Sequence, residues 1–132
     1  MEKSQLGKKL RIQPGHRMLI LKAPPGYMEE LGDLPEGVEV AEQPEGTFDF
    51  VQLFVKSLAE LRSESPRAFE AVKYDGLLWI SYPKKSSKLE SDLTRDVIWA
   101  EVVKTGWRPV AQVSVNDVWS AIRLRPAERV EK

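Results

Sequence analysis

The sequence contains no cysteine, only one histidine and no long apolar run. The lack of cysteine excludes a disulfide framework, a thiolate zinc site and a cysteine nucleophile. Because His16 stands alone, a metal site built on several histidines is excluded as well. No apolar run approaches the roughly 18 residues that span a bilayer, and the first residues are too polar for a signal peptide. We therefore expect a cytoplasmic protein that holds no metal and does not enter the membrane.

The chain also lacks an excess of charge of either sign. Its 20 Lys and Arg residues balance 20 Asp and Glu residues, whereas nucleic-acid binding normally requires a basic excess, so no nucleic-acid partner is expected. The balance conceals a segregation. One stretch without Lys or Arg is either a solvated loop region, the simpler interpretation, or an acidic face for a basic partner. Its acids are Glu29, Glu30, Asp33, Glu36, Glu39, Glu42, Glu45 and Asp49.

A length of 132 residues predicts a single domain, 1–132, with one hydrophobic core. Residues 1–11 are expected to form a loose lead-in or a short helix, and residues 126–132 a tail. Short apolar runs bounded by Gly and Pro are typical of strands that are buried on both faces of a parallel sheet. The sequence predicts such strands at 17–22, 38–41, 48–55 and 77–82.

Helices are expected between these strands. A short helical turn is expected around 28–31. Ser57 and Glu60 form a capping box, in which each side chain satisfies a backbone N–H at the start of a helix. The pair Ser65-Pro66 is typical of a helix N-terminus, because the missing N–H of proline costs nothing at the first helical position. The sequence therefore predicts that helical structure restarts at this pair.

The last third of the chain is expected to hold a helix and a hairpin. The longest helix is expected to begin at Ser91 or Asp92 and to end at Thr105-Gly106, where glycine closes it. The β-branched runs 110–115 and 118–124 are joined by a two-residue Asn-Asp connection. Such a connection predicts a terminal β-hairpin.

Strands that alternate with helices predict βαβ units, a mainly parallel sheet and helices on both faces. Ending such a sheet in an antiparallel hairpin resembles the class I methyltransferase-like variant of the Rossmann fold. The segment Phe-Asp-Phe-Val-Gln-Leu (48–53) resembles the central strand of that family, and Lys-Tyr-Asp-Gly-Leu-Leu-Trp-Ile (73–80) resembles its next strand. The resemblance covers 12–125. It implies a three-layer α/β fold, shortened by one strand and one helix after Ala41.

The chain also resembles a small bacterial family without an assigned function. The segments that carry this resemblance are Ala-Pro-Pro-Gly-Tyr (23–27), Tyr-Pro-Lys-Lys-Ser-Ser (82–87) and Asp-Val-Trp-Ser-Ala-Ile-Arg (117–123).

The methyltransferase resemblance implies a glycine-rich turn after the first strand that binds S-adenosylmethionine, because only glycine lets the backbone approach the cofactor closely. Here that turn reads Lys-Ala-Pro-Pro-Gly-Tyr over 22–27. Its two prolines remove two backbone donors and only one glycine remains, which disfavours S-adenosylmethionine as the cofactor. The acidic residue that the family places against the ribose corresponds to Glu42, at the end of the second strand.

Ligands of open α/β sheets bind outside the carboxyl ends of the strands, near the point where the strand order reverses. Three segments that directly follow parallel strands should meet there, namely 22–27, 56–57 and 82–87. Their lysines, hydroxyls and helix N-terminus favour a small anion or a nucleotide-like ligand, whereas the simpler interpretation is that the lysines keep the loops soluble. No catalytic residue is assigned. The candidate binding residues are Lys22, Pro25, Gly26, Tyr27, Glu42, Lys56, Ser57, Tyr82, Lys84, Lys85, Ser86 and Ser87.

Three functions stay open at this point. The leading hypothesis is a non-catalytic, methyltransferase-like binding or regulatory module with an anion-binding crevice at the carboxyl edge of the sheet. The first alternative is a small-molecule methyltransferase that uses S-adenosylmethionine through an atypical cofactor loop. The second is an oligomerising, partner-binding protein that uses the acidic stretch or an exposed sheet edge. Fold alone does not choose among them, because one fold hosts many functions.

Overall fold

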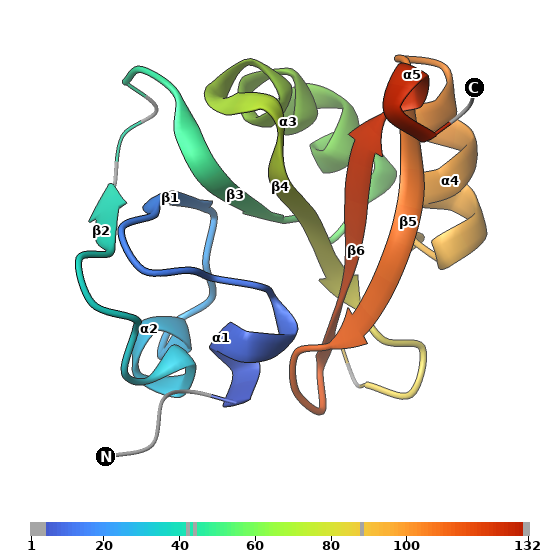
Figure 1. The fold of residues 1–132 in the computed structure, drawn as a ribbon. Coiled ribbons are helices and arrows are strands. Elements are labelled where there is room, and N and C mark those ends of the chain that lie inside the picture. Colours follow the sequence, from blue (N-terminus) through green and yellow to red (C-terminus); the bar gives the residue numbers. More distant parts are fainter. Residues whose placement is uncertain (1–4, 42, 44, 88, 131–132) are drawn as a thin grey trace.

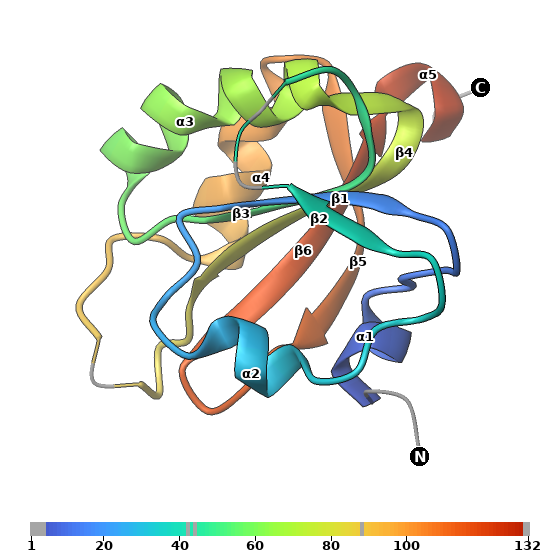
Figure 2. The same cartoon turned by 90° about the vertical axis from the view of Figure 1, so that its left-hand side faces the viewer.

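The computed structural model describes residues 5–41, 43, 45–87 and 89–130. One six-stranded sheet with strand order β2-β1-β3-β4-β6-β5 runs through the molecule, and helices lie on both of its faces (Figures 1 and 2). The strands are β1 (Arg17–Leu21), β2 (Glu39–Ala41), β3 (Phe48–Phe54), β4 (Val72–Pro83), β5 (Trp107–Ser114) and β6 (Trp119–Pro126). The helices are α1 (Gln5–Lys9), α2 (Tyr27–Leu31), α3 (Leu58–Ala71), α4 (Arg95–Val103) and α5 (Ala127–Val130).

The strands β2, β1, β3 and β4 run parallel to one another, whereas β6 is antiparallel to β4 and β5 is antiparallel to β6. This confirms the expected fold class, a mostly parallel sheet that ends in an antiparallel hairpin. From β1 the chain continues outward to β2, and from β3 it continues in the opposite direction to β4. The strand order therefore reverses between β1 and β3, so their carboxyl ends mark the position where such sheets bind ligands.

Helices α3 and α4 cover one face of the sheet (Figure 2). Alternate residues of each strand point to this face, because successive side chains of a strand point to opposite sides. The apolar core beneath the two helices includes Leu19, Val51, Leu53, Leu61, Ala68, Leu78, Ile80, Ile98, Val102, Ile122 and Leu124, all buried.

Helices α1 and α2 lie on the opposite face (Figure 2). Residues 5–9 form the short helix that is one of the two expectations for 1–11, and after it Leu10 is fully buried and Ile12 nearly so. The indole N–H of Trp79 donates to the carbonyl oxygen of Leu10 at 3.0 Å and fixes the segment after α1 over β4. The second core includes Leu6, Leu10, Ile12, Met18, Tyr27, Leu31, Phe50, Phe54, Trp79, Trp119 and Ala121.

The expected restart of helical structure at Ser65-Pro66 is wrong. Residues 58–71 form one continuous helix, and Pro66 lies inside it. A proline at that position removes one backbone hydrogen bond and carries a clash that disfavours a helix interior. Leu61 and Ala68, two turns apart and both fully buried, lie on the same side of α3 and pack into one core. Tertiary burial of this apolar stripe outweighs the local preference of proline.

The expected start of the next helix at Ser91 or Asp92 is also wrong. Thr94 is the N-cap of α4, and its Oγ1 accepts a hydrogen bond from the N–H of Val97 at 3.1 Å. Asp92 instead accepts from the N–H of Leu58 at 2.8 Å, at the start of the neighbouring helix α3. The shift shortens α4 to 9 residues, so α3, with 14 residues, is the longer helix.

Several elements extend beyond their expected bounds. β4 begins at Val72 rather than at Leu77, with an irregularity in its pairing to β3. The hairpin strands β5 and β6 each begin or end outside the expected runs, and the segment expected as a tail holds α5. Within the described ranges, no helix is long and apolar enough to cross a bilayer.

Candidate functional site

The turn after β1 is a hydrogen-bonded β-turn. The N–H of Tyr27 donates to the carbonyl oxygen of Pro24 at 3.1 Å. Pro25 occupies the second position of the turn and Gly26 the third, where φ 82° and ψ −2° are the left-handed geometry of a type II turn. Proline supplies the φ that the second position needs, and glycine tolerates the positive φ of the third. The turn uses the Tyr27 amide internally, and its prolines supply none.

The side chain of Tyr27 fills the space below this turn. Its hydroxyl donates to Oε1 of Gln52 on β3 at 2.7 Å, and Nε2 of Gln52 donates to Oγ of Ser81 on β4 at 2.9 Å. Tyr27 is 2% exposed, and Gln52 and Ser81 are fully buried. This chain of hydrogen bonds joins the turn to β3 and β4. Buried polar groups that are satisfied in this way rigidify the structure around them.

Aromatic contacts hold the same side chain in place. The Tyr27 ring packs edge-on against Phe54 at a centroid distance of 4.7 Å, and Phe54 packs edge-on against Trp119 at 5.1 Å. Burial raises the pKa of the Tyr27 hydroxyl above its ordinary value. The hydroxyl therefore stays protonated at neutral pH and keeps donating to Gln52. Tyr27 is therefore a buried core side chain rather than the wall of a ligand site.

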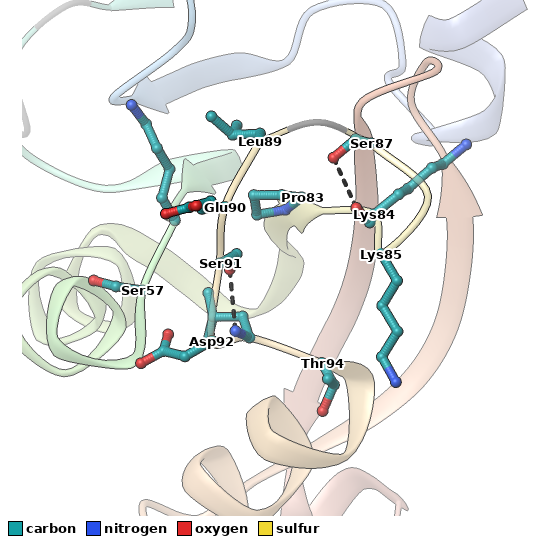
Figure 3. Close-up of a pocket in the computed structure, with 12 residues that line it drawn as sticks. Ser57, Pro83, Lys84, Lys85, Ser87, Leu89, Glu90, Ser91, Asp92 and Thr94 are labelled. Carbon is teal, nitrogen blue, oxygen red and sulfur yellow. Dashed lines mark hydrogen bonds between the residues drawn. The ribbon is translucent and has the colours of Figure 1, made fainter.

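An open cleft of about 710 Å³ lies at the carboxyl ends of β3 and β4. We call it the β4 cleft. The start of α3, the end of β4 and the loop that leads into α4 form its walls (Figure 3). The structure brings together in it a group of residues that the sequence predicts: Lys56, Ser57, Lys84, Lys85 and Ser87.

Three hydroxyls of the β4 cleft have an O–H that donates to no acceptor among the described residues. The oxygens of Ser57, Ser91 and Thr94 each accept a hydrogen bond from a backbone N–H, namely those of Glu60, Leu93 and Val97. A hydroxyl that accepts in this way still has its own O–H to donate. Ser87 differs, because its hydroxyl donates to the carbonyl oxygen of Lys84 at 2.7 Å. The three free O–H groups suit a ligand rich in acceptor oxygens.

Charges of both signs line the β4 cleft. Lys84 and Lys85 extend in different directions from the start of the loop (Figure 3). Nζ of Lys84 donates to Oγ of Ser114 on β5 at 2.6 Å, and its backbone N–H donates to the carbonyl oxygen of Val118, which anchors the start of the loop to the hairpin. Lys85 is exposed at the rim. Among the described lining residues, Lys56 on the opposite wall brings the lysines to three, against the two acids Glu90 and Asp92.

The protein's own carboxylates already occupy the N-terminus of α3. Asp92 accepts from the N–H of Leu58 at 2.8 Å, and Oε1 of Glu60 accepts from the N–H of Lys56 at 2.7 Å. The remaining N–H of the capping box, that of Glu60, is bound by Ser57, as the sequence predicts. The contacts of Leu58 and Glu60 leave fewer free amides to attract an anion at this helix N-terminus. An anion in the cleft would therefore rely mainly on the lysines and hydroxyls.

Other predicted site residues lie elsewhere. Nζ of Lys22 is 3.7 Å from Oε1 of Glu64 on α3, and neither residue lines the β4 cleft. Tyr82 is 5% exposed, and its hydroxyl accepts from Nε2 of Gln112 on β5 at 3.0 Å. Ser86 is exposed in the loop but is not part of the lining, and Pro25 and Gly26 belong to the β-turn described above. Glu42 lies outside the described residues.

The sequence does not predict more than half of the described lining. The other lining residues are Pro83, Leu89, Glu90, Ser91, Asp92, Leu93 and Thr94. The interpretation of Ser91 and Asp92 as caps of the following helix hides their position in the cleft. The available sequence signal is the cluster of Ser, Asp and Thr residues at 91–94. One residue suffices to cap a helix, so several cap residues in succession indicate a loop whose other polar side chains make different contacts.

The β4 cleft offers ammonium, hydroxyl and carboxylate groups, but neither histidine nor a metal-ligand cluster is found in it among the described residues. The single histidine, His16, lies in a turn near α1, where its Nδ1 accepts from the N–H of Gln13 at 3.1 Å. In the part of the chain that the structure describes, no group of three or more His, Asp or Glu side chains gathers as metal ligands do.

No protein-family model and no curated protein matches the chain. Solved structures are similar to it. DhpI in complex with SAH has a TM-score of 0.63 and 13% identity, over 90% of this chain and 81% of that chain. The N-methyltransferase NodS from Bradyrhizobium japonicum WM9, in complex with S-adenosyl-L-homocysteine (SAH), has a TM-score of 0.59 and 11% identity, over 92% and 83%.

A ribosomal protein L11 methylase from Lactobacillus delbrueckii subsp. bulgaricus is similar as well. Its TM-score is 0.54 and its identity 10%, over 92% of this chain and 74% of that chain. At such low identities the likeness shows the fold alone. The chain has a methyltransferase-like Rossmann fold, as its strand order also indicates.

Proposed function

We propose that this protein is a non-catalytic binding module of the methyltransferase-like fold, which holds a small anionic or nucleotide-like ligand in the β4 cleft. The observation that carries the proposal is the donor set of the cleft: lysine ammonium groups and three free hydroxyl protons at the carboxyl ends of two parallel strands. Ligands of this sheet type bind along the carboxyl edge, and the cleft borders β3, one of the two strands between which the strand order reverses. Phosphate and carboxylate groups supply the acceptor oxygens that match such donors.

The turn after β1 supports a binding role rather than methyl transfer. A cofactor loop needs backbone amides and close backbone approach, which glycines provide. This turn has two prolines, uses its Tyr27 amide internally and is fixed from below by the buried Tyr27 side chain. Its residues serve the stability of the sheet.

A second candidate is a methyltransferase that binds S-adenosylmethionine in an atypical way. The similarity to DhpI, to the N-methyltransferase NodS and to a ribosomal protein L11 methylase favours this candidate. Two of these structures hold SAH, the product that the cofactor leaves after methyl transfer. The cofactor of this protein would then have to lie in the β4 cleft or above the β-turn.

Calorimetric titration with ADP and with inorganic pyrophosphate tests the proposed function. We expect the intact chain to bind at least one of the two probes, and the double variant Lys84→Ala/Lys85→Ala to bind it at least about tenfold more weakly, because charge-assisted hydrogen bonds are lost. The matched control is Lys8→Ala/Lys104→Ala, which removes the same charge from α1 and from the end of α4. Absence of heat with both probes at millimolar concentration, or equal weakening in the control, would overturn the proposal.

A further inference from the structure

Four arginines lie on or near strand β6, and two of them are on the face of the sheet that α1 and α2 partly cover. Arg123 and Arg125 are two residues apart on β6, so their side chains point to the same face. That face is opposite to the one on which Ile122 and Leu124 pack against α3 and α4. Arg129 comes from α5, immediately after the strand, and Arg11 follows α1. We call these four residues the arginine cluster.

Arg11 is brought to Arg123 by the segment after α1. Trp79 on β4 is the cross-strand partner of Arg123, and its indole N–H donates to the carbonyl oxygen of Leu10. The chain therefore crosses β4 beside Arg123, and Arg11 is the next residue. Burial and the charges of Arg11 and Arg125 lower the pKa of Arg123. Arg123 and Arg125 thus point away from α3 and α4, the helices that flank the β4 cleft.

The arginines differ in whether their charge is compensated. Asp75 accepts two hydrogen bonds from Arg125, at 2.8 and 2.7 Å, and one from Arg129 at 3.2 Å. Nε of Arg123, by contrast, is buried and has no hydrogen-bond partner. Among the described residues, no carboxylate pairs with Arg123 or with Arg11. Arg123 as a whole is half-buried, so part of the residue is exposed to solvent.

A buried guanidinium N–H without an acceptor is unusual, because most buried donors in proteins find one. A second cation nearby adds charge repulsion, which a bound anion would relieve. Arginine has a planar fork of donors that fits phosphate oxygens in pairs.

We propose that Arg123 and Arg11 form a second anion site, separate from the β4 cleft, which binds a phosphate group. The phosphate belongs either to a small phosphoester or to the backbone of a single-stranded nucleic acid. Arg125 and Arg129, held in place by Asp75, extend the positive surface beyond the phosphate. The net charge of zero does not oppose this site, because the acids that balance the chain concentrate in residues 29–49.

The test measures binding to the full-length chain carrying Lys84→Ala/Lys85→Ala, so that the β4 cleft does not contribute. The probes are inorganic phosphate, by calorimetry, and a fluorescent oligothymidylate of about 12 nucleotides, by anisotropy at several salt concentrations. On this background Arg11→Gln/Arg123→Gln is compared with Arg62→Gln/Arg67→Gln, which removes two arginine charges from α3. The single variant Arg11→Gln, at an exposed position, keeps the test valid if the double variant does not fold.

We expect phosphate to bind, and Arg11→Gln/Arg123→Gln to weaken its binding at least about tenfold while the α3 control leaves it unchanged. Binding of phosphate alone identifies a small phosphoester as the source, and binding of the oligonucleotide with the same loss identifies a nucleic-acid backbone. The inference is overturned if neither probe binds, or if both arginine pairs have equal effects. Because the cleft lysines are absent from this background, failure here is distinguishable from failure of the proposed function.

Discussion

Two loops that follow parallel strands at the same edge of the sheet differ in what fills them. After β1, a type II turn closes on itself, and the Tyr27 side chain occupies the space beneath it. After β4, the chain instead forms a long loop that borders an open cleft. At the same edge of the sheet, the space after β1 is thus filled by a buried side chain, whereas the loop after β4 presents accessible polar groups.

The contrast teaches that sheet topology locates an edge but not a site. Topology brings the ends of β1, β3 and β4 to one side of the molecule. Whether a ligand can bind there depends on the side chain that the turn directs inward. Gly26 permits the turn that sends Tyr27 into the core, and this local geometry decides that the β1 side is filled.

The largest expected effect concerns Tyr27→Ala, which removes the side chain that fills the space beneath the turn after β1. Loss of this buried aromatic ring should lower the free energy of unfolding by about 3 to 5 kcal/mol, since it removes apolar contacts with Phe54 and leaves a cavity. Urea denaturation measures the change. Tyr74→Ala is the control, because Tyr74 is 67% exposed and should change stability by less than about 0.5 kcal/mol. Similar effects of the two substitutions would refute the structural role of Tyr27.

Tyr27→Phe separates the contribution of the Tyr27 hydrogen bond from that of the packing of its ring. The variant keeps the ring but leaves Oε1 of buried Gln52 without its donor, which should cost about 1 to 3 kcal/mol. The comparison is Tyr82→Phe, whose lost partner, Gln112, is exposed and regains a water molecule. Thermal unfolding should show a clear decrease for Tyr27→Phe and a smaller one for Tyr82→Phe. The reverse order would contradict the account.

Asp75→Asn supplies a reference far from both loops. The guanidinium of Arg125, with that of Arg129, lowers the pKa of Asp75 from 3.8 to about 2. Because the folded pKa lies below the ordinary value, the ionised group stabilises the fold above about pH 4, and this contribution disappears as the pH falls towards 2. Asparagine also tolerates the left-handed φ of 56° at this position.

Solvent screens this partly exposed pair, so Asp75→Asn should lower the free energy of unfolding by about 1 kcal/mol at pH 7. Chemical denaturation between pH 7 and pH 2 measures how the two proteins converge. A difference that stays constant over the whole range would show that the carboxylate charge contributes nothing.

The smallest expected effect on stability concerns the β4 cleft. Lys84→Ala/Lys85→Ala should change the free energy of unfolding by no more than about 0.5 kcal/mol, because Lys85 is exposed and half-buried Lys84 loses only one solvent-exposed side-chain hydrogen bond, that to Ser114. The same variant should bind ADP or pyrophosphate at least about tenfold more weakly than the unmodified chain. Unfolding and calorimetry on one preparation check both statements. Large destabilisation with unchanged binding would reverse the roles assigned to the two loops.

The sequence predicts the strands of the sheet well because their burial on two faces is visible as apolar runs. Phe50, Val51 and Leu53 are buried as that pattern indicates. Helix ends are predicted poorly where several residues compete. Ser91, Asp92 and Thr94 are all good caps, and the choice of Thr94 depends on Asp92 binding the N–H of Leu58. That contact joins residues far apart in the sequence, so no local pattern contains it.

The candidate site is predictable only to the same extent. Topology places Lys56 and Lys84 at one edge, and the structure confirms that they share a cleft. The direction of Tyr27 and Tyr82 follows from side-chain alternation and turn geometry, which fix them in the core rather than in a pocket wall. The buried partner of Tyr27, Gln52, has no sequence signal, because a polar residue within an apolar strand gives no indication of what it binds.

Calorimetric titration of the folded chain with S-adenosylhomocysteine asks whether the turn after β1 can bind the cofactor of methyl transfer, because this ligand requires a cofactor turn but no knowledge of an acceptor. We expect no heat up to millimolar ligand, since the turn after β1 offers few backbone donors and Tyr27 fills the space beneath it. Micromolar binding that Gly26→Val abolishes, in a variant shown to be folded, would overturn the structural role given to this turn and make the protein a candidate methyltransferase.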